Sequence, residues 1–82
     1  MNLKQIVNEL IECAEGETGI VAELARELIE VHSQYNAGEI NKEEFDFLVT
    51  EIADVKAMNS LADDESACRW ICECAEVLLM AV

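Results

Sequence analysis

The residues best suited to chemistry are four cysteines and a single histidine. They are Cys13, His32, Cys68, Cys72 and Cys74. Thiolates and imidazole nitrogens are common zinc ligands, and a thiol beside an imidazole is also the core of a cysteine nucleophile. A metal centre and a nucleophilic site are therefore the first two possibilities to weigh.

The spacing favours neither possibility. At about 100° per residue, Cys68 and Cys72 share a helix face, whereas Cys74 projects roughly 200° around from Cys72. A tetrahedral site would then need distant Cys13 and His32 to converge on two helical ligands. No nucleophile turn, oxyanion motif or orienting residue accompanies His32, and three glycines exclude a phosphate-binding loop. We expect no metal, no cofactor and no enzymatic activity, with the cysteines packing as small apolar side chains.

The charge of the chain limits its partners. Its 82 residues contain 18 Asp and Glu against 5 Lys and Arg, a formal net charge of -13. Such a total repels nucleic acid and anionic membrane surfaces, and attracts basic proteins. We expect the partner to be a basic protein surface, such as that of a nucleic-acid-binding protein, or another copy of the chain, with no direct binding to nucleic acid or membrane.

The composition indicates a folded protein rather than an acidic tail. The chain is 52% hydrophobic, contains no proline and carries its apolar residues at regular spacing. Its length predicts one domain, an acidic helical bundle over residues 1–82. The N-terminus has no signal-peptide core and no run approaches the ~20 apolar residues of a membrane span. These features predict a cytoplasmic protein with reduced thiols, in the host cytoplasm if it is phage-encoded.

The apolar spacing predicts an all-α fold. We expect a bundle of four antiparallel amphipathic helices, or three if the chain bends rather than breaks at Asn59 and Ser60. The third helix should turn Phe45, Leu48, Val49, Ile52 and Val55 inward. The expected end signals, in chain order, are Gly16, Thr18, Gly38, Asn41 and then Ser60 or Asp63.

The clearest local signal joins the second and third helices. Gly38 is a typical helix stop, and Asn41 followed by Glu44 forms a capping-box pattern. With the run Ala37-Gly38-Glu39-Ile40-Asn41-Lys42-Glu43-Glu44-Phe45, residues 28–52 resemble the short helical hairpin of the SHOCT type. The resemblance implies a hairpin with an oligomerisation or interaction role.

Three groups of residues are candidates for binding. The first is acidic and lies on the second helix and the hairpin: Glu23, Glu27, Glu30, Glu39, Glu43 and Glu44. The second extends the apolar face of the fourth helix over more than half its circumference: Trp70, Cys74 and Val77. The third is Phe47 and Met58, which project away from the inward face of the third helix. We favour a fourth helix that is interior and a Phe47 and Met58 that cover a neighbouring helix, with exposed contact sites as the alternative.

Two functions follow from these surfaces. The first is a small non-enzymatic interaction protein, an inhibitor or nucleic-acid-mimicking decoy that binds a basic protein; it is similar in character to the acidic proteins that bacteriophages encode. The second is a homo-oligomeric assembly or adaptor module that uses the apolar fourth helix, with the acidic surface serving solubility.

Overall fold

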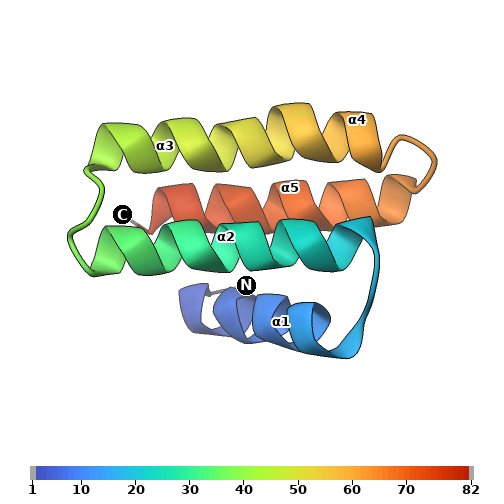
Figure 1. Ribbon diagram of the computed structural model, residues 1–82, viewed down its shortest axis with the longest axis horizontal. Helices are drawn as coiled ribbons and strands as arrows, with labels where there is room; N and C mark the ends of the chain where they lie inside the picture. The colour runs from blue at the N-terminus through green and yellow to red at the C-terminus, as the bar shows by residue number, and fades with distance from the viewer. Residues whose placement is uncertain (1, 82) are drawn as a thin grey trace.

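A computed structural model of the chain describes residues 2–81, and they form helices joined by short turns (Figure 1). No strand occurs in this part of the chain, which confirms the all-α prediction. The helical elements, in order, are α1 (Leu3–Gly16), α2 (Ile20–Asn36), α3 (Lys42–Thr50), η1 (Glu51–Ala57), α4 (Met58–Ser60) and α5 (Glu65–Met80). Since α3, η1 and α4 follow one another without a break, residues 2–81 form four helical rods.

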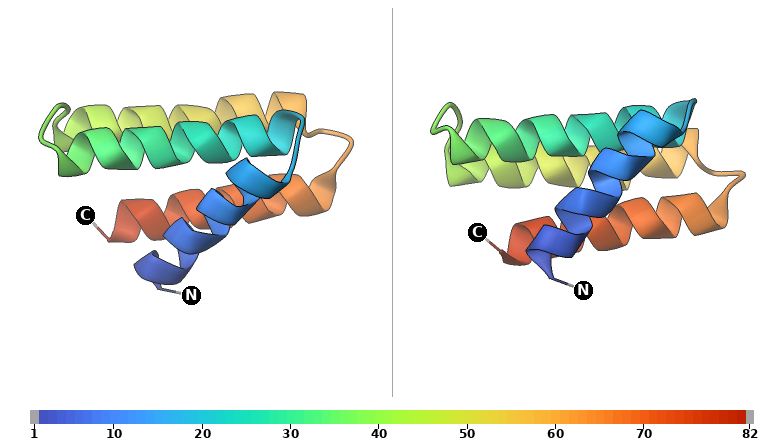
Figure 2. Two further views of the ribbon diagram at one scale, coloured as in Figure 1. Left: turned by 60° about the horizontal axis from the view of Figure 1, so that its bottom comes forward. Right: turned by 90° about the horizontal axis from the view of Figure 1, so that it is seen from below.

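Three of the rods lie side by side and alternate in direction: α2, the rod of α3, η1 and α4, and α5 (Figure 1). The first helix is different. Figure 2 shows α1 crossing obliquely over α2 and α5 rather than running alongside them. This crossing brings α1 into contact with both α2 and α5.

All four rods contribute to one buried apolar cluster. Its apolar residues recur at three-and-four spacing along each helix, so each helix has a face to bury. The largest fully buried side chains are Phe45, Ile6, Leu10, Leu28, Ile71, Leu78, Val49 and Cys74.

The turn between α2 and α3 has the conformation that its sequence predicts. Gly38 adopts a φ of 79°, and the next amide, of Glu39, donates to the carbonyl of Gln34 at 2.9 Å. The amide of Glu44 donates to Oδ1 of Asn41 at 2.8 Å, and the amide of Asn41 donates to Oε1 of Glu44 at 3.2 Å. Both halves of the capping box are therefore present, and the predicted hairpin is confirmed.

The turn between α1 and α2 differs from the prediction. Gly16 is the last residue of α1, and Gly19, with a φ of 91°, precedes α2 in place of Thr18. The α1 carbonyls find other donors: the amide of Glu17 donates to Cys13 at 3.1 Å. From α2, the guanidinium of Arg26 donates to the carbonyl of Ala14 at 3.2 Å. A tertiary contact thus completes a helix end that glycine alone was expected to close.

A π-helical segment corrects the predicted inward face of the third helix. Val55 is 51% exposed, whereas Ala53 and Ala57 are buried. In η1 each turn holds more residues than an α turn, so the positions that face the core shift from those that the α-helical repeat predicts. The carbonyl of Ala53 accepts a hydrogen bond from Sγ of Cys72 on α5 at 3.8 Å, so α5 packs closely against this segment.

Candidate functional site

A groove runs between α2 and the rod formed by α3 and η1, and its rim is acidic. We call it the acidic groove; it encloses about 210 Å³ and is lined by Glu27, Glu30, Val31, Gln34, Leu48, Glu51, Ile52 and Lys56. Its carboxylates come from both walls because each helix places an acid at the edge of its buried face. The buried floor and charged rim together form a surface on which a partner can be held by contact area as well as charge.

Phe47 stands beside the acidic groove. Its side chain is 65% exposed, and it lines a neighbouring hollow with Glu43, Glu44 and Leu48. Leu48 also lines the acidic groove, so the two hollows adjoin. An exposed aromatic ring among carboxylates is the combination expected of a protein-binding site.

The structure brings most of the predicted acidic residues to this surface. Glu27 and Glu30 line the groove, Glu43 and Glu44 line the adjoining hollow, and Glu23 is exposed one turn before Glu27 on α2. Glu39 is exposed in the turn and lines neither hollow. Sequence reasoning missed Glu51, although its spacing of seven residues from Glu44 is a signal for a shared helix face.

One basic residue enters the acidic groove. The ammonium of Lys56 donates to Oε1 of Glu27, and this ion pair ties η1 to α2. The hydrogen bond to Glu27 raises the pKa of Lys56, with partial burial opposing it. Five carboxylates in the two adjoining hollows, Glu27, Glu30, Glu43, Glu44 and Glu51, thus face a single ammonium among the residues that line them.

The predicted contact face on the fourth helix is wrong for Cys74. Cys74 is fully buried, and Glu9 and Cys13 of α1, the helix that crosses over α5 (Figure 2), lie near it. Trp70 and Val77 are half-buried and pack against the core. The polar side expected of this helix is exposed, at Glu65, Arg69, Glu73 and Glu76. α5 packs against α1, α2, α3 and η1, as expected of an interior helix.

Phe47 and Met58 do not cover a neighbouring helix, contrary to the interpretation favoured from the sequence. Their side chains are 65% and 58% exposed. Met58 lines a different hollow from Phe47, together with Leu61, Ala62, Glu65, Cys68 and Arg69. They are therefore two separate apolar spots, since about 16 Å of helix lies between residues 11 positions apart.

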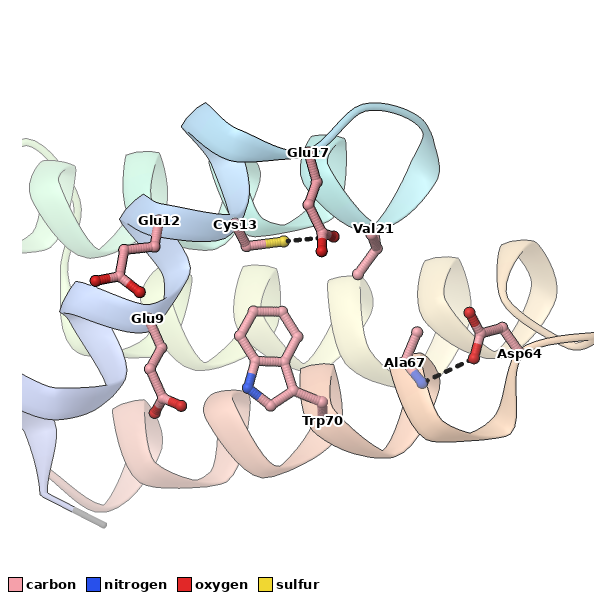
Figure 3. Close-up of a pocket in the computed structure, with 8 residues that line it drawn as sticks. All are labelled: Glu9, Glu12, Cys13, Glu17, Val21, Asp64, Ala67 and Trp70. Atoms are coloured by element: carbon pink, nitrogen blue, oxygen red, sulfur yellow. Dashed lines mark hydrogen bonds between the residues drawn. The ribbon is translucent and has the colours of Figure 1, made fainter.

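A second acidic groove lies between α1 and α5, with the one tryptophan of the chain in it (Figure 3). We call it the Trp70 groove; it encloses about 500 Å³ and is lined by Glu9, Glu12, Cys13, Glu17, Val21, Asp64, Ala67 and Trp70. Sequence reasoning did not find this site, because its residues come from three helices, α1, α2 and α5, and the turns beside them.

The thiols and the histidine lie in ordinary packing environments. Burial raises the pKa of Cys74 to about 12, with the charge of Glu9 adding to it. Burial also raises the pKa of Cys13 and of Cys72, and lowers the pKa of His32. His32 lies against Phe45, with ring centroids 6.5 Å apart. Within residues 2–81, no three His, Cys, Asp or Glu side chains are grouped so that they could hold a metal ion.

None of the described helices combines the length and the apolar character needed to cross a membrane. The SHOCT-like character of residues 28–52 stays a prediction. Comparison of the chain with protein-family models, with curated proteins and with solved structures finds no match.

Proposed function

We propose that this is a small non-enzymatic interaction protein that binds a basic protein surface through the acidic groove and Phe47. The observation that carries the proposal is the position of Phe47, an exposed aromatic ring beside a groove with carboxylates on both walls. The carboxylates attract a basic partner over a distance of about a Debye length, and the ring supplies contact area once it arrives. Such a protein acts as an inhibitor or decoy of the phage type, because it occupies a basic surface that otherwise binds nucleic acid.

The spacing of the carboxylates limits how closely the protein can imitate the charge of nucleic acid. At the helical rise of 1.5 Å per residue, Glu23 and Glu27 are about 6 Å apart along α2, and Glu27 and Glu30 about 4.5 Å. Duplex DNA carries one charge per ~1.7 Å of axis. One row of carboxylates is therefore about three times sparser than the duplex, and charge alone gives weak competition. The proposal accordingly relies on both groove walls and on Phe47.

The alternative of an oligomeric module built on the fourth helix has less support. Most of the apolar surface of α5 is already in contact with the other helices, and Cys74 is fully buried. Among the described residues, Met80 is the one large exposed apolar side chain on α5, and the others are Ile11, Ile20, Phe47, Val55 and Met58.

The test compares two triple variants of equal net charge. Glu27→Gln/Glu30→Gln/Glu51→Gln removes three charges at the acidic groove, and Glu15→Gln/Glu73→Gln/Glu76→Gln removes three exposed charges from α1 and α5. A basic partner is first recovered from lysate at low salt, identified and purified, and its affinity for each variant is measured at 50 and 200 mM salt. The groove variant is expected to lose more affinity and to show the smaller salt dependence. Equal losses in the two variants would reduce the interaction to non-specific charge attraction.

A further inference from the structure

The Trp70 groove combines the indole ring with carboxylates from α1 and from the two turns beside it. Glu9 and Glu12 lie on one side of the indole ring, Glu17 lies across from them, and Asp64 lies towards the start of α5 (Figure 3). No basic side chain is among the described residues that line it. Four carboxylates are thus gathered around one half-buried aromatic ring without an opposing charge.

The four carboxylates of the Trp70 groove differ in whether they already accept a hydrogen bond. Asp64 caps α5, since one of its oxygens accepts from the amide of Ala67 at 3.1 Å. Glu17 accepts a weak hydrogen bond from the thiol of Cys13 at 3.7 Å, and that thiol stays protonated because burial raises its pKa. Glu9 and Glu12 remain as the charges that a ligand in the groove can pair with.

Glu9 is the most informative of these residues. Although the side chain as a whole is only partly covered, its Oε2 is buried and has no hydrogen-bond partner. This oxygen is shielded, so a group in the groove cannot donate to it directly, but the negative charge of a partly desolvated carboxylate is stabilised by a cation close by. Figure 3 shows the indole nitrogen of Trp70 on the side of Glu9, so the ring and the carboxylate border the same space.

We propose that the Trp70 groove binds one guanidinium group, the side chain of an arginine on a partner protein. A guanidinium is planar, so it can stack on the indole while its N–H groups point along its plane towards Glu9 and Glu12. Lysine fits less well, because its ammonium is a compact, strongly hydrated charge without a flat face. The proposal rests on the proposed function only for the source of the arginine, because the Trp70 groove shares no lining residue with the acidic groove.

The single tryptophan makes the test direct, because all indole fluorescence reports on this groove. The probes are a blocked Gly-Arg-Gly peptide, its citrulline counterpart, which has nearly the same shape without the charge, and a Gly-Lys-Gly peptide. At low salt, the arginine peptide is expected to change the fluorescence of Trp70 saturably and to shift the NMR signal of its indole N–H. We expect it to bind about tenfold more tightly than the citrulline peptide. Equal binding of the citrulline or lysine peptide would overturn the proposal.

Matched variants locate the binding. Glu9→Gln and Glu12→Gln keep the side-chain shape, and each is expected to weaken the arginine peptide several-fold. Glu15→Gln makes the same charge change on an exposed part of α1 outside the groove, and should have little effect. Because Glu12 is exposed, its substitution tests the proposal even if the Glu9 variant disturbs the packing of α1. A loss in the Glu15 variant equal to that in the Glu9 and Glu12 variants would contradict the proposal.

The two proposals fail independently. If the arginine peptide does not bind while the acidic-groove variants still lose a basic partner, the Trp70 groove is not an arginine site and the proposed function stands. If the peptide binds as described but no basic protein depends on the acidic groove, the proposed function fails and this inference stands.

Discussion

Glu27 on α2 and Lys56 in η1 form an ion pair across the acidic groove, although 29 positions separate them in the sequence. Their side chains are 37% and 42% exposed, so water still reaches both. The pair thus contributes little to stability. Its ammonium lies among the carboxylates of the acidic groove, where we propose that a basic partner binds.

Removing this ammonium should change the affinity for a basic partner more than it changes the stability of the fold. In Lys56→Gln, we expect the free energy of unfolding to change by at most about 1 kcal/mol, as for other exposed ion pairs. The affinity for a basic partner should rise, because Glu27 is freed and a repulsive charge is lost. Thermal unfolding and binding at fixed salt measure the two effects.

The control for this prediction is Lys4→Gln, which makes the same change in net charge on an exposed part of α1. An equal gain in affinity in both variants would mean that only the total charge matters and that the acidic groove has no special role.

Phe45 and Phe47 offer a matched pair of substitutions two residues apart. Phe45 is fully buried and stacks near Tyr35, with ring centroids 4.8 Å apart, whereas Phe47 is 65% exposed. Phe45→Ala should cost about 3–5 kcal/mol, a large part of the roughly 4–12 kcal/mol expected for a chain of this length. Phe47→Ala should cost less than about 0.5 kcal/mol but weaken partner binding.

Urea denaturation followed by circular dichroism measures the difference between the two phenylalanine variants. Met80→Ala serves as the binding control, because Met80 is also exposed, at 84%, but lies on α5. Comparable destabilisation by the Phe45 and Phe47 substitutions would contradict the placement of Phe47 at the surface.

Local signals in the sequence were sufficient for the α2–α3 hairpin. The stop at Gly38 and the capping box of Asn41 and Glu44 depend on residues a few positions apart, so their geometry follows from the order of the residues. The helical periodicity likewise identified most buried positions up to residue 52, because burial follows the same repeat, but Ile11 and Ile20 on the predicted apolar faces are exposed.

Features that depend on contacts between helices could not be predicted in this way. The π turns of η1 move burial from Val55 to Ala53 and Ala57, and no spacing rule announces where an extra residue enters a turn. Cys74 is buried near Glu9 and Cys13 of α1, and the way in which α1 crosses α5 is a property of the packing. The Trp70 groove was not predicted either, because its lining residues meet only when the helices pack together.

The cysteines should differ in reactivity according to their burial. Cys74 is fully buried and its pKa is raised to about 12, so almost no thiolate is present at pH 8 and none is accessible. We expect a maleimide to leave Cys74 unmodified in the native protein and to modify it after denaturation. Peptide mapping by mass spectrometry follows each thiol separately. Native modification of Cys74 at the rate of the partly exposed Cys13 would show that Cys74 is not buried as described.

The stability of the fold should decrease as the pH falls through the range in which histidine titrates. Burial lowers the pKa of His32 in the folded state, while an unfolded histidine titrates near about 6.5. Below that pH the unfolded state therefore binds more protons than the folded state, and protons favour unfolding. The interval from pH 7.5 to 5.5 spans the titration of an unfolded histidine, and the His32→Gln variant separates its contribution from that of other groups. We expect the melting temperature of the wild type to fall over this interval, and that of His32→Gln to change less. An identical change in both proteins would assign the pH dependence to other groups.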